Sequence, residues 1–162
     1  MIDEFSIRPI KPADLNRLKE IINASFSRFL RYFAQHSIKT EEITFVVVTQ
    51  KEVVVGFAKP IKFKIGDASF GCILWVAVHP QFRLKGLASM LVKANVEFLK
   101  NEGAKTIFAS IQKRNASSLA VFDKQGFRRM SFSELWRLFN WRIFEFFGDI
   151  WLAPGEVVLM HD

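Results

Sequence analysis

The pattern of apolar and polar positions along the chain predicts strands and helices in alternation. β-branched or alternating runs predict strands, and apolar residues at helical spacing predict helices. The predicted strands are FSIRPI, the two runs of ITFVVVTQKEVVVGFAKPIKF with a turn near Gln50-Lys51, ASFGCILWVAV, KTIFASI, FRRMSF and GEVVLMHD. The predicted helices are PADLNRLKEIINASF, a short second helix through Phe26–Phe33, Gly86 to Asn101, NASSLAVFDKQ and LWRLFNWRIFEFF.

The resulting order is strand, two helices, three strands, helix, strand, helix, strand, helix, strand. This order predicts an α/β (α+β) fold, a mixed sheet with helices on both faces. The strand–helix–strand segment at residues 70–111 is expected to form a right-handed parallel crossover. No repeat, low-complexity tract or linker interrupts the chain, so we expect residues 1–162 to form a single domain.

Composition supports a folded, cytoplasmic protein. Hydrophobic residues make up 50% of the 162 residues, with 18 Phe, which argues against intrinsic disorder. No apolar run approaches the ~18–20 residues of a membrane span, and MIDEFSIRP lacks the apolar stretch of a secretory signal. The single cysteine, Cys72, cannot form an internal disulfide and fits a reducing compartment.

The net charge of +7 bears on partners rather than on fold. Polyphosphate cofactors, nucleic acid, acidic proteins and anionic membranes all become plausible partners. The basic residues form no dense Lys/Arg block, which argues against a nucleic-acid binder.

Candidate chemistry lies in VHPQFRLKGLASML, where a strand leads into a helix. The first turn of a helix has N–H groups without intrahelical partners, which favour a bound anion. Gly86 and Ala88 allow a ligand to approach the backbone, and Arg83 and Lys85 add positive charge. The same residues also fit an ordinary strand–helix turn with a glycine for packing and two exposed bases.

Two motifs decide between these interpretations by resemblance. RLKGLA resembles the (R/Q)-x-x-G-x-(G/A) segment that binds acetyl-CoA in the GNAT superfamily, the Gcn5-related N-acetyltransferases. NASSLAVFDKQGF resembles the superfamily's Asn-led helix with its Gly-Phe end, at Asn115, Gly126 and Phe127. The order of elements fits from residue 5 to residue 160. The resemblance implies a largely antiparallel GNAT-like sheet around the central crossover.

The resemblance also implies a reaction and a set of cofactor contacts. In this superfamily an amine attacks the thioester of acetyl-CoA directly, so alignment of the two reactants provides much of the catalysis. Main-chain groups of Val76 and Val78 would pair with the pantetheine arm, with Val76 or its neighbour polarising the acetyl carbonyl. Asn115 would contact the pantetheine portion as well as cap its helix. Diphosphate binding is implied for the segment Arg83, Leu84, Lys85, Gly86, Leu87 and Ala88. No metal is expected.

The usual acid and base of the superfamily are missing. The Tyr that protonates the leaving thiolate in many members corresponds here to Phe122. Weak replacements are Tyr32, Ser117 and Ser118. FGCILWVAV carries no acid that could act as base, and the candidates by residue type are Asp67, Glu134, His36 and His161. His79 and Cys72 are interpreted as structural. The catalytic residues are therefore unassigned.

An aromatic helix is predicted at about 135–147, between the last two strands. One face fits a core, but Leu138, Trp141 and Phe144 lie among polar residues on the other. They could line an acceptor pocket, form a homodimer interface or contact a membrane surface. We favour an interface or pocket wall.

The leading functional prediction is an acetyl-CoA-dependent N-acetyltransferase that acts on a primary amine of a small molecule or protein. The alternative is a non-catalytic acetyl-CoA-binding module, favoured by the missing Tyr and Glu. A basic, aromatic-rich membrane or nucleic-acid binder is the third.

Overall fold

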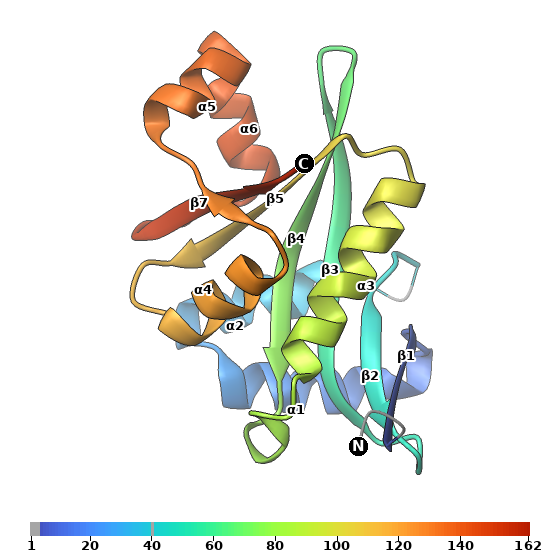
Figure 1. The fold of residues 1–162 in the computed structure, drawn as a ribbon. Coiled ribbons are helices and arrows are strands. Elements are labelled where there is room, and N and C mark those ends of the chain that lie inside the picture. The colour runs from blue at the N-terminus through green and yellow to red at the C-terminus, as the bar shows by residue number, and fades with distance from the viewer. Residues whose placement is uncertain (1–3, 40) are drawn as a thin grey trace. The chain divides into compact units, whose positions relative to one another are not determined.

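The computed structural model describes residues 4–39 and 41–162, in which a seven-stranded sheet has the order β1-β2-β3-β4-β5-β7-β6 (Figure 1). The strands are β1 (Phe5–Pro9), β2 (Phe45–Thr49), β3 (Val54–Ile65), β4 (Ala68–Val78), β5 (Thr106–Gln112), β6 (Arg128–Arg129) and β7 (Glu156–His161). β4 and β5 pair in parallel, whereas the β1–β2, β2–β3, β5–β7 and β6–β7 ladders are antiparallel. This mixed sheet confirms the predicted fold class.

The helical elements lie between these strands in the predicted order. The α-helices are α1 (Leu15–Ser25), α2 (Arg28–Ser37), α3 (Leu87–Asn101), α4 (Ala116–Lys124), α5 (Phe132–Phe139) and α6 (Ile143–Asp149). Short 3-10 turns are η2 (Pro12–Asp14), η3 (Pro80–Phe82) and η4 (Asn140–Arg142).

Backbone contacts divide the chain into two compact units. The first unit comprises residues 1–60 and 75–95, and the second comprises residues 61–74 and 96–162. β3, β4 and α3 each begin in one unit and end in the other. The single-domain organisation of residues 1–162 stays a prediction.

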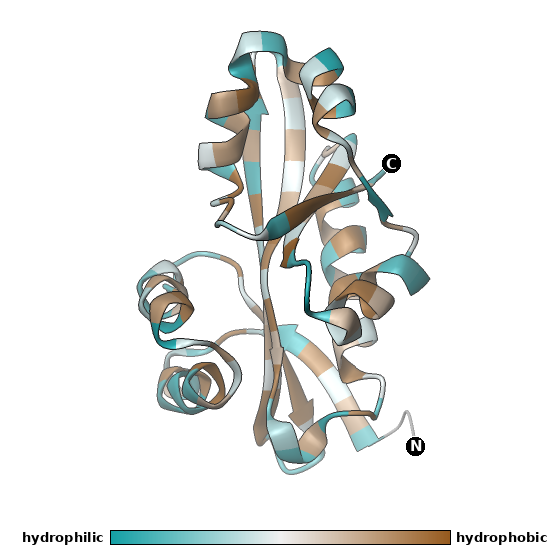
Figure 2. Ribbon diagram, turned by 90° about the vertical axis from the view of Figure 1, so that its left-hand side faces the viewer, coloured by the Kyte–Doolittle hydropathy of each residue, from teal (hydrophilic) through white to brown (hydrophobic). Residues whose placement is uncertain are grey.

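The first unit buries apolar residues on both faces of its strands. Val46 and Val48 of β2 face α1 and α2, where they pack with Leu18 and Ile22. The two helices lie next to each other on one side of these strands (Figure 2). On the other face, Val47 packs with Leu91 of α3. Because successive side chains of a strand point to opposite faces, Val46 and Val48 contribute to one core and Val47 to the other.

The second unit has an aromatic core around Phe146, which is fully buried. The ring of Phe146 lies 4.7 Å from that of Phe108 on β5 and 4.4 Å from that of Phe139 on α5, measured between centroids. Phe63, near the end of β3, lies 6.1 Å away. α5 and α6 thus contribute directly to the core of this unit.

The segment predicted as one helix at 135–147 differs from that expectation. It is two helices, α5 and α6, separated by η4. Asn140, at the end of α5, has a left-handed φ of 48°, which ends the helix and redirects the chain. The break explains why the apolar residues of 135–147 do not lie on one face of a single continuous helix. Leu138, Trp141 and Phe144 remain exposed, and the ring of Trp141 contacts Trp136 at 4.9 Å.

Candidate active site

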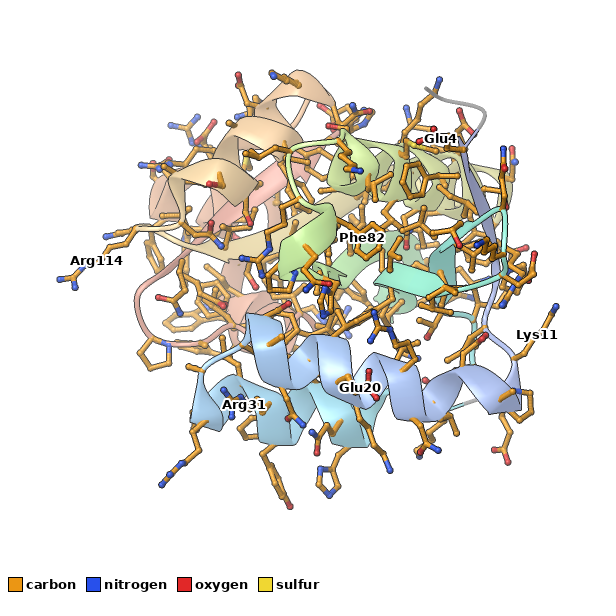
Figure 3. All side chains as sticks on the ribbon, turned by 90° about the horizontal axis from the view of Figure 1, so that it is seen from below. Glu4, Lys11, Glu20, Arg31, Phe82 and Arg114 are labelled. Carbon is orange, nitrogen blue, oxygen red and sulfur yellow. The ribbon has the colours of Figure 1, made fainter. Side chains whose placement is uncertain are left out.

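The turn from β4 to α3 has an unusual backbone. After η3, Leu84 adopts a φ of 61° and Gly86 a φ of 78°, both left-handed. Leu84 is fully exposed, so packing does not explain its conformation. Seen from below, Phe82 marks this turn above α1 (Figure 3). A non-glycine residue held in this region is costly and is typical of functional sites.

Gly86 leaves open space at the start of α3. An added Cβ at Gly86 would have no protein atom within 4 Å, so the glycine is not required for packing. The first hydrogen bond of the helix runs from the amide of Met90 to the Gly86 carbonyl at 3.1 Å. The amides of Leu87, Ala88 and Ser89 lie before it and therefore have no acceptor within the helix. These N–H groups and the dipole of the 15-residue helix provide an anion site of the kind that a diphosphate fits.

The two basic side chains of the turn have contacts within the protein. Arg83 Nε donates to the Val78 carbonyl at 3.0 Å, and an Arg83 terminal nitrogen donates to Ser25 Oγ at 3.3 Å. Lys85 Nζ lies 5.9 and 5.8 Å from the ring centroids of Phe5 and Phe82. Arg83 therefore holds the turn against β4 and the end of α1. The contact with Ser25 had no signal in the sequence.

β4 presents Val76 and Val78 near this turn. The ladder that joins β4 to β5 comprises Phe70–Cys72 paired with Thr106–Phe108. Val76 and Val78 lie beyond its last position. Their side chains pack with the α3 face of the first unit.

Asn115 lies in the second unit, at the start of α4. Its Oδ1 accepts a hydrogen bond from the Ser118 amide at 3.1 Å, which confirms the predicted helix cap. Ser117 is exposed on the same turn. Phe122 is 4% exposed and packs edge-to-face on Phe127 at 4.9 Å, so this position is part of the core.

The candidate acids and bases are divided between the two units. Tyr32 and His36 belong to α2 of the first unit, where their rings lie 4.1 Å apart. Asp67 lies exposed in the turn between β3 and β4, and His161 packs on Phe127 in the second unit. Across residues 4–39 and 41–162, no cluster of three or more His, Cys, Asp or Glu side chains could hold a metal.

Two other titratable groups have structural explanations. Burial raises the pKa of the Cys72 thiol, which disfavours a nucleophilic thiolate. Glu134 forms a capping box with Ser131: the Ser131 amide donates to Glu134 Oε2 at 2.8 Å, and the Glu134 amide donates to Ser131 Oγ at 3.3 Å. Hydrogen bonds from the Ser131 amide, from its hydroxyl and from Arg128 lower the pKa of Glu134 to about 2. Such a carboxylate is a poor general base at neutral pH.

We expect NMR titration to show the Glu134 carboxyl titrating near a pKa of about 2 in the folded protein. Because this pKa lies below that of the unfolded chain, the stabilisation is complete above the unfolded pKa. This contribution of Glu134 to stability is lost as the pH falls toward the pKa of the group in the folded protein. Ser131→Ala should raise the pKa, since it removes the hydroxyl donor. A native pKa near the ordinary ~4.3 of Glu would contradict the capping role.

A mixed sheet with a glycine turn at the head of a long helix is the arrangement of the GNAT acetyltransferases. A family model, described as the acetyltransferase (GNAT) family, matches residues 15–127. The match covers more than half of the chain, and the chain belongs to this family. Membership of this family confirms the predicted family. It also confirms the predicted enzyme class, N-acetyltransferase, and acetyl-CoA as the acyl donor.

Individual relatives are distant. An N-alpha-acetyltransferase of Saccharolobus solfataricus is 23% identical over 137 residues, which cover 78% of this chain and 82% of that protein. A crystal structure of the NatC complex bound to Gag peptide and CoA contains a similar chain, with a TM-score of 0.69, 19% identity and 97% coverage of both chains. The PaiA N-acetyltransferase of Thermoplasma acidophilum in complex with coenzyme A has a TM-score of 0.68, 13% identity and 98% coverage of both chains.

No helix in the described part of the chain is both long and apolar enough to cross a bilayer.

Proposed function

We propose that this protein transfers the acetyl group of acetyl-CoA to a primary amine of a small molecule or protein by direct attack. The amine nitrogen bonds to the acetyl carbonyl carbon while the carbon–sulfur bond breaks. The nitrogen loses one proton, and the sulfur of the released CoA gains one. Alignment of the two reactants can supply ~7–11 kcal/mol of the barrier reduction.

One observation carries this proposal: the open, left-handed turn at Gly86 in front of α3. The amides of Leu84 to Ala88 would bind the diphosphate, with Arg83 holding the turn and Lys85 adding charge. The peptide groups of Val76 and Val78 would pair with the pantetheine arm, and Asn115 would reach the same portion.

A binding measurement followed by a turnover measurement tests the proposal. Acetyl-CoA should raise the melting temperature of the protein, because a ligand that binds only the native state stabilises it. Free thiol should then appear when an amine panel is added, together with product masses increased by one acetyl group. The absence of both effects would contradict the proposal.

The alternative is a module that binds acetyl-CoA without chemistry. It is favoured by Phe122, which is buried where many family members have a Tyr, and by the lack of an acid on β4. This alternative predicts a raised melting temperature without release of thiol. Tyr32, Ser117 and Ser118 stay weak candidates for the acid, and water can also protonate the thiolate.

Phe122→Tyr tests whether an acid is missing. If a hydroxyl at this position can protonate the thiolate, kcat at saturating substrates should rise with little change in KM for acetyl-CoA. The measurement is steady-state thiol release across pH. An unchanged kcat in a folded variant would remove the idea that Phe122 limits turnover.

Three finer predictions remain proposals. A homodimer or acceptor-pocket wall formed by residues 135–147 is supported by the exposed side chains of Leu138, Trp141 and Phe144. The cytoplasmic location rests on composition and the single cysteine. A membrane or nucleic-acid partner lacks a dense basic cluster in the sequence.

A further inference from the structure

The outward side of α2 carries a row of aromatic rings in solvent. Phe29 is 61% exposed and Tyr32 is 60% exposed. The ring centroids of Phe29 and Phe33 are 5.0 Å apart, those of Phe33 and Tyr32 5.5 Å, and those of Tyr32 and His36 4.1 Å, so the rings form a connected surface. Arg28 and Arg31 lie on the same helix. We call Arg28, Phe29, Arg31, Tyr32 and His36 the α2 surface.

The charged side chains within and directly after α2 in the sequence have one sign. Between Glu20 and Glu41 the chain contains Arg28, Arg31 and Lys39 but no acid. The Arg31 guanidinium is fixed by a 2.8 Å hydrogen bond from Nε to the Phe26 carbonyl. The planar guanidinium groups of Arg28 and Arg31 can pair with carboxylates through two hydrogen bonds.

Two of the acids nearest to α2 in the sequence, Glu20 and Glu42, are paired with other bases. Glu20 accepts from Arg17 at 2.5 Å, and Glu42 accepts from Lys59 at 2.5 Å. The Lys59 side chain is buried, so this pair cannot reorient freely to neutralise α2. The positive charge of the α2 surface therefore favours an external anionic partner.

The α2 surface begins beside the candidate active site, within the first unit. Phe26, between α1 and α2, packs edge-to-face on Trp75 of β4 at 5.4 Å. Ser25 Oγ accepts the hydrogen bond from Arg83 of the glycine turn. α2 starts at Arg28, two residues after Phe26. An acceptor whose amine reaches Val76 could continue along α2.

Trp75, which packs on Phe26, gives a second indication that the acetyl acceptor binds next to the start of α2. Its indole N–H is buried, and no described residue accepts a hydrogen bond from it. A buried donor without a partner costs free energy, which a carbonyl oxygen of a bound chain would recover.

Other occupants fit less well. Segments that bind anionic lipids typically carry clusters of 4–8 Lys/Arg, and nucleic-acid surfaces make about 6–10 phosphate contacts, whereas the α2 surface and Lys39 supply three cations. A two-fold contact between two copies would place the same positive residues against each other. Tyr, Phe and Arg together are typical of the centres of protein interfaces.

We propose that the acceptor is a polypeptide and that the α2 surface binds an acidic segment of it, a few residues after the amine that is acetylated. This inference rests on the proposed function and adds the class of acceptor. The rings of Phe29 and Tyr32 pack on the peptide, and Arg28 and Arg31 pair with its carboxylates.

The test compares three peptides that share their first three residues and carry Glu, Gln or Lys at positions four to seven. Acetylation is followed by mass spectrometry, and binding of fluorescein-labelled peptides by anisotropy in the presence of CoA. We expect kcat/KM for the Glu peptide to exceed that for the Gln peptide roughly tenfold at low salt. High salt should reduce the difference.

Two charge-reversal variants distinguish the effect of the α2 surface from the effect of the protein's net charge. Arg28→Glu should remove most of the preference for the Glu peptide, and Tyr32→Ala should weaken binding of all three peptides. Lys19→Glu, on the exposed side of α1, changes the net charge equally and should leave the preference intact. Melting temperatures without peptide check that each variant is folded.

The outcomes distinguish the two proposals. Acetylation of small amines without any Glu preference would overturn this inference and leave the proposed function standing. Arg28-dependent peptide binding without acetylation of any amine would overturn the proposed function and the assignment of the peptide as acceptor. Arg28-dependent binding to vesicles containing phosphatidylserine, or Arg28-dependent dimerisation, with no peptide preference, would assign the surface to a membrane or to a second copy instead.

Discussion

Gly86→Ala should weaken acetyl-CoA binding at least tenfold while it leaves the protein folded. Alanine at a φ of 78° costs about 1–2 kcal/mol of stability, because an L-residue is strained in the left-handed region. Its Cβ meets no protein atom within 4 Å, so no clash with the fold adds to this cost. The Cβ would instead occupy the space where we place the diphosphate. A tenfold loss corresponds to about 1.4 kcal/mol of binding free energy.

Gly103→Ala is the matched control at the other end of α3. Gly103 has a φ of 88°, and an added Cβ there also meets no atom within 4 Å. Both variants should therefore lose similar stability without ligand. Thermal unfolding with and without acetyl-CoA separates the two effects, because only Gly86→Ala should lose the ligand-induced rise in melting temperature.

An equal rise in melting temperature in both variants would place the diphosphate elsewhere than the turn at Gly86. It would also remove the observation on which the proposed function depends. A loss of the rise in both variants would instead indicate that strain at either end of α3 disturbs the site.

Local signals in the sequence are informative where the structure depends on local chemistry. The sequence predicted that Asn115 caps α4, and the structure adds that Gly86 adopts the left-handed conformation that glycine favours. Both need only a few neighbouring residues. The β-branched run around Val46, Val47 and Val48 likewise predicted the strand β2.

Features that depend on distant residues could not be predicted. The sequence indicates the charge of Arg83 and Lys85 but not that Ser25 and Phe5 meet their side chains. The break at Asn140 had only a weak signal, because asparagine adopts a positive φ more readily than most residues but also occurs inside helices. Residues of α5 and α6, on the two sides of that break, pack in the same core as Phe63 and Phe108.

The same packing predicts a large loss of stability for Phe146→Ala. Phe146 is 0% exposed and contacts the rings of Phe108 and Phe139. Removal of a buried phenyl ring costs about 3–5 kcal/mol through lost burial and the cavity that remains. Since small proteins are stable by only about 5–15 kcal/mol, this is a large share of the total.

Phe144→Ala, two positions earlier in the same helix, is the control. Its ring is 67% exposed, and truncation there should change stability by about 0.5 kcal/mol or less. Urea unfolding at constant m-value measures both variants. Equal losses would contradict the core seen around Phe146. A large loss at Phe146 alone would show that α6, which lies beyond the family match at residues 15–127, stabilises the core of the second unit rather than being added to its surface.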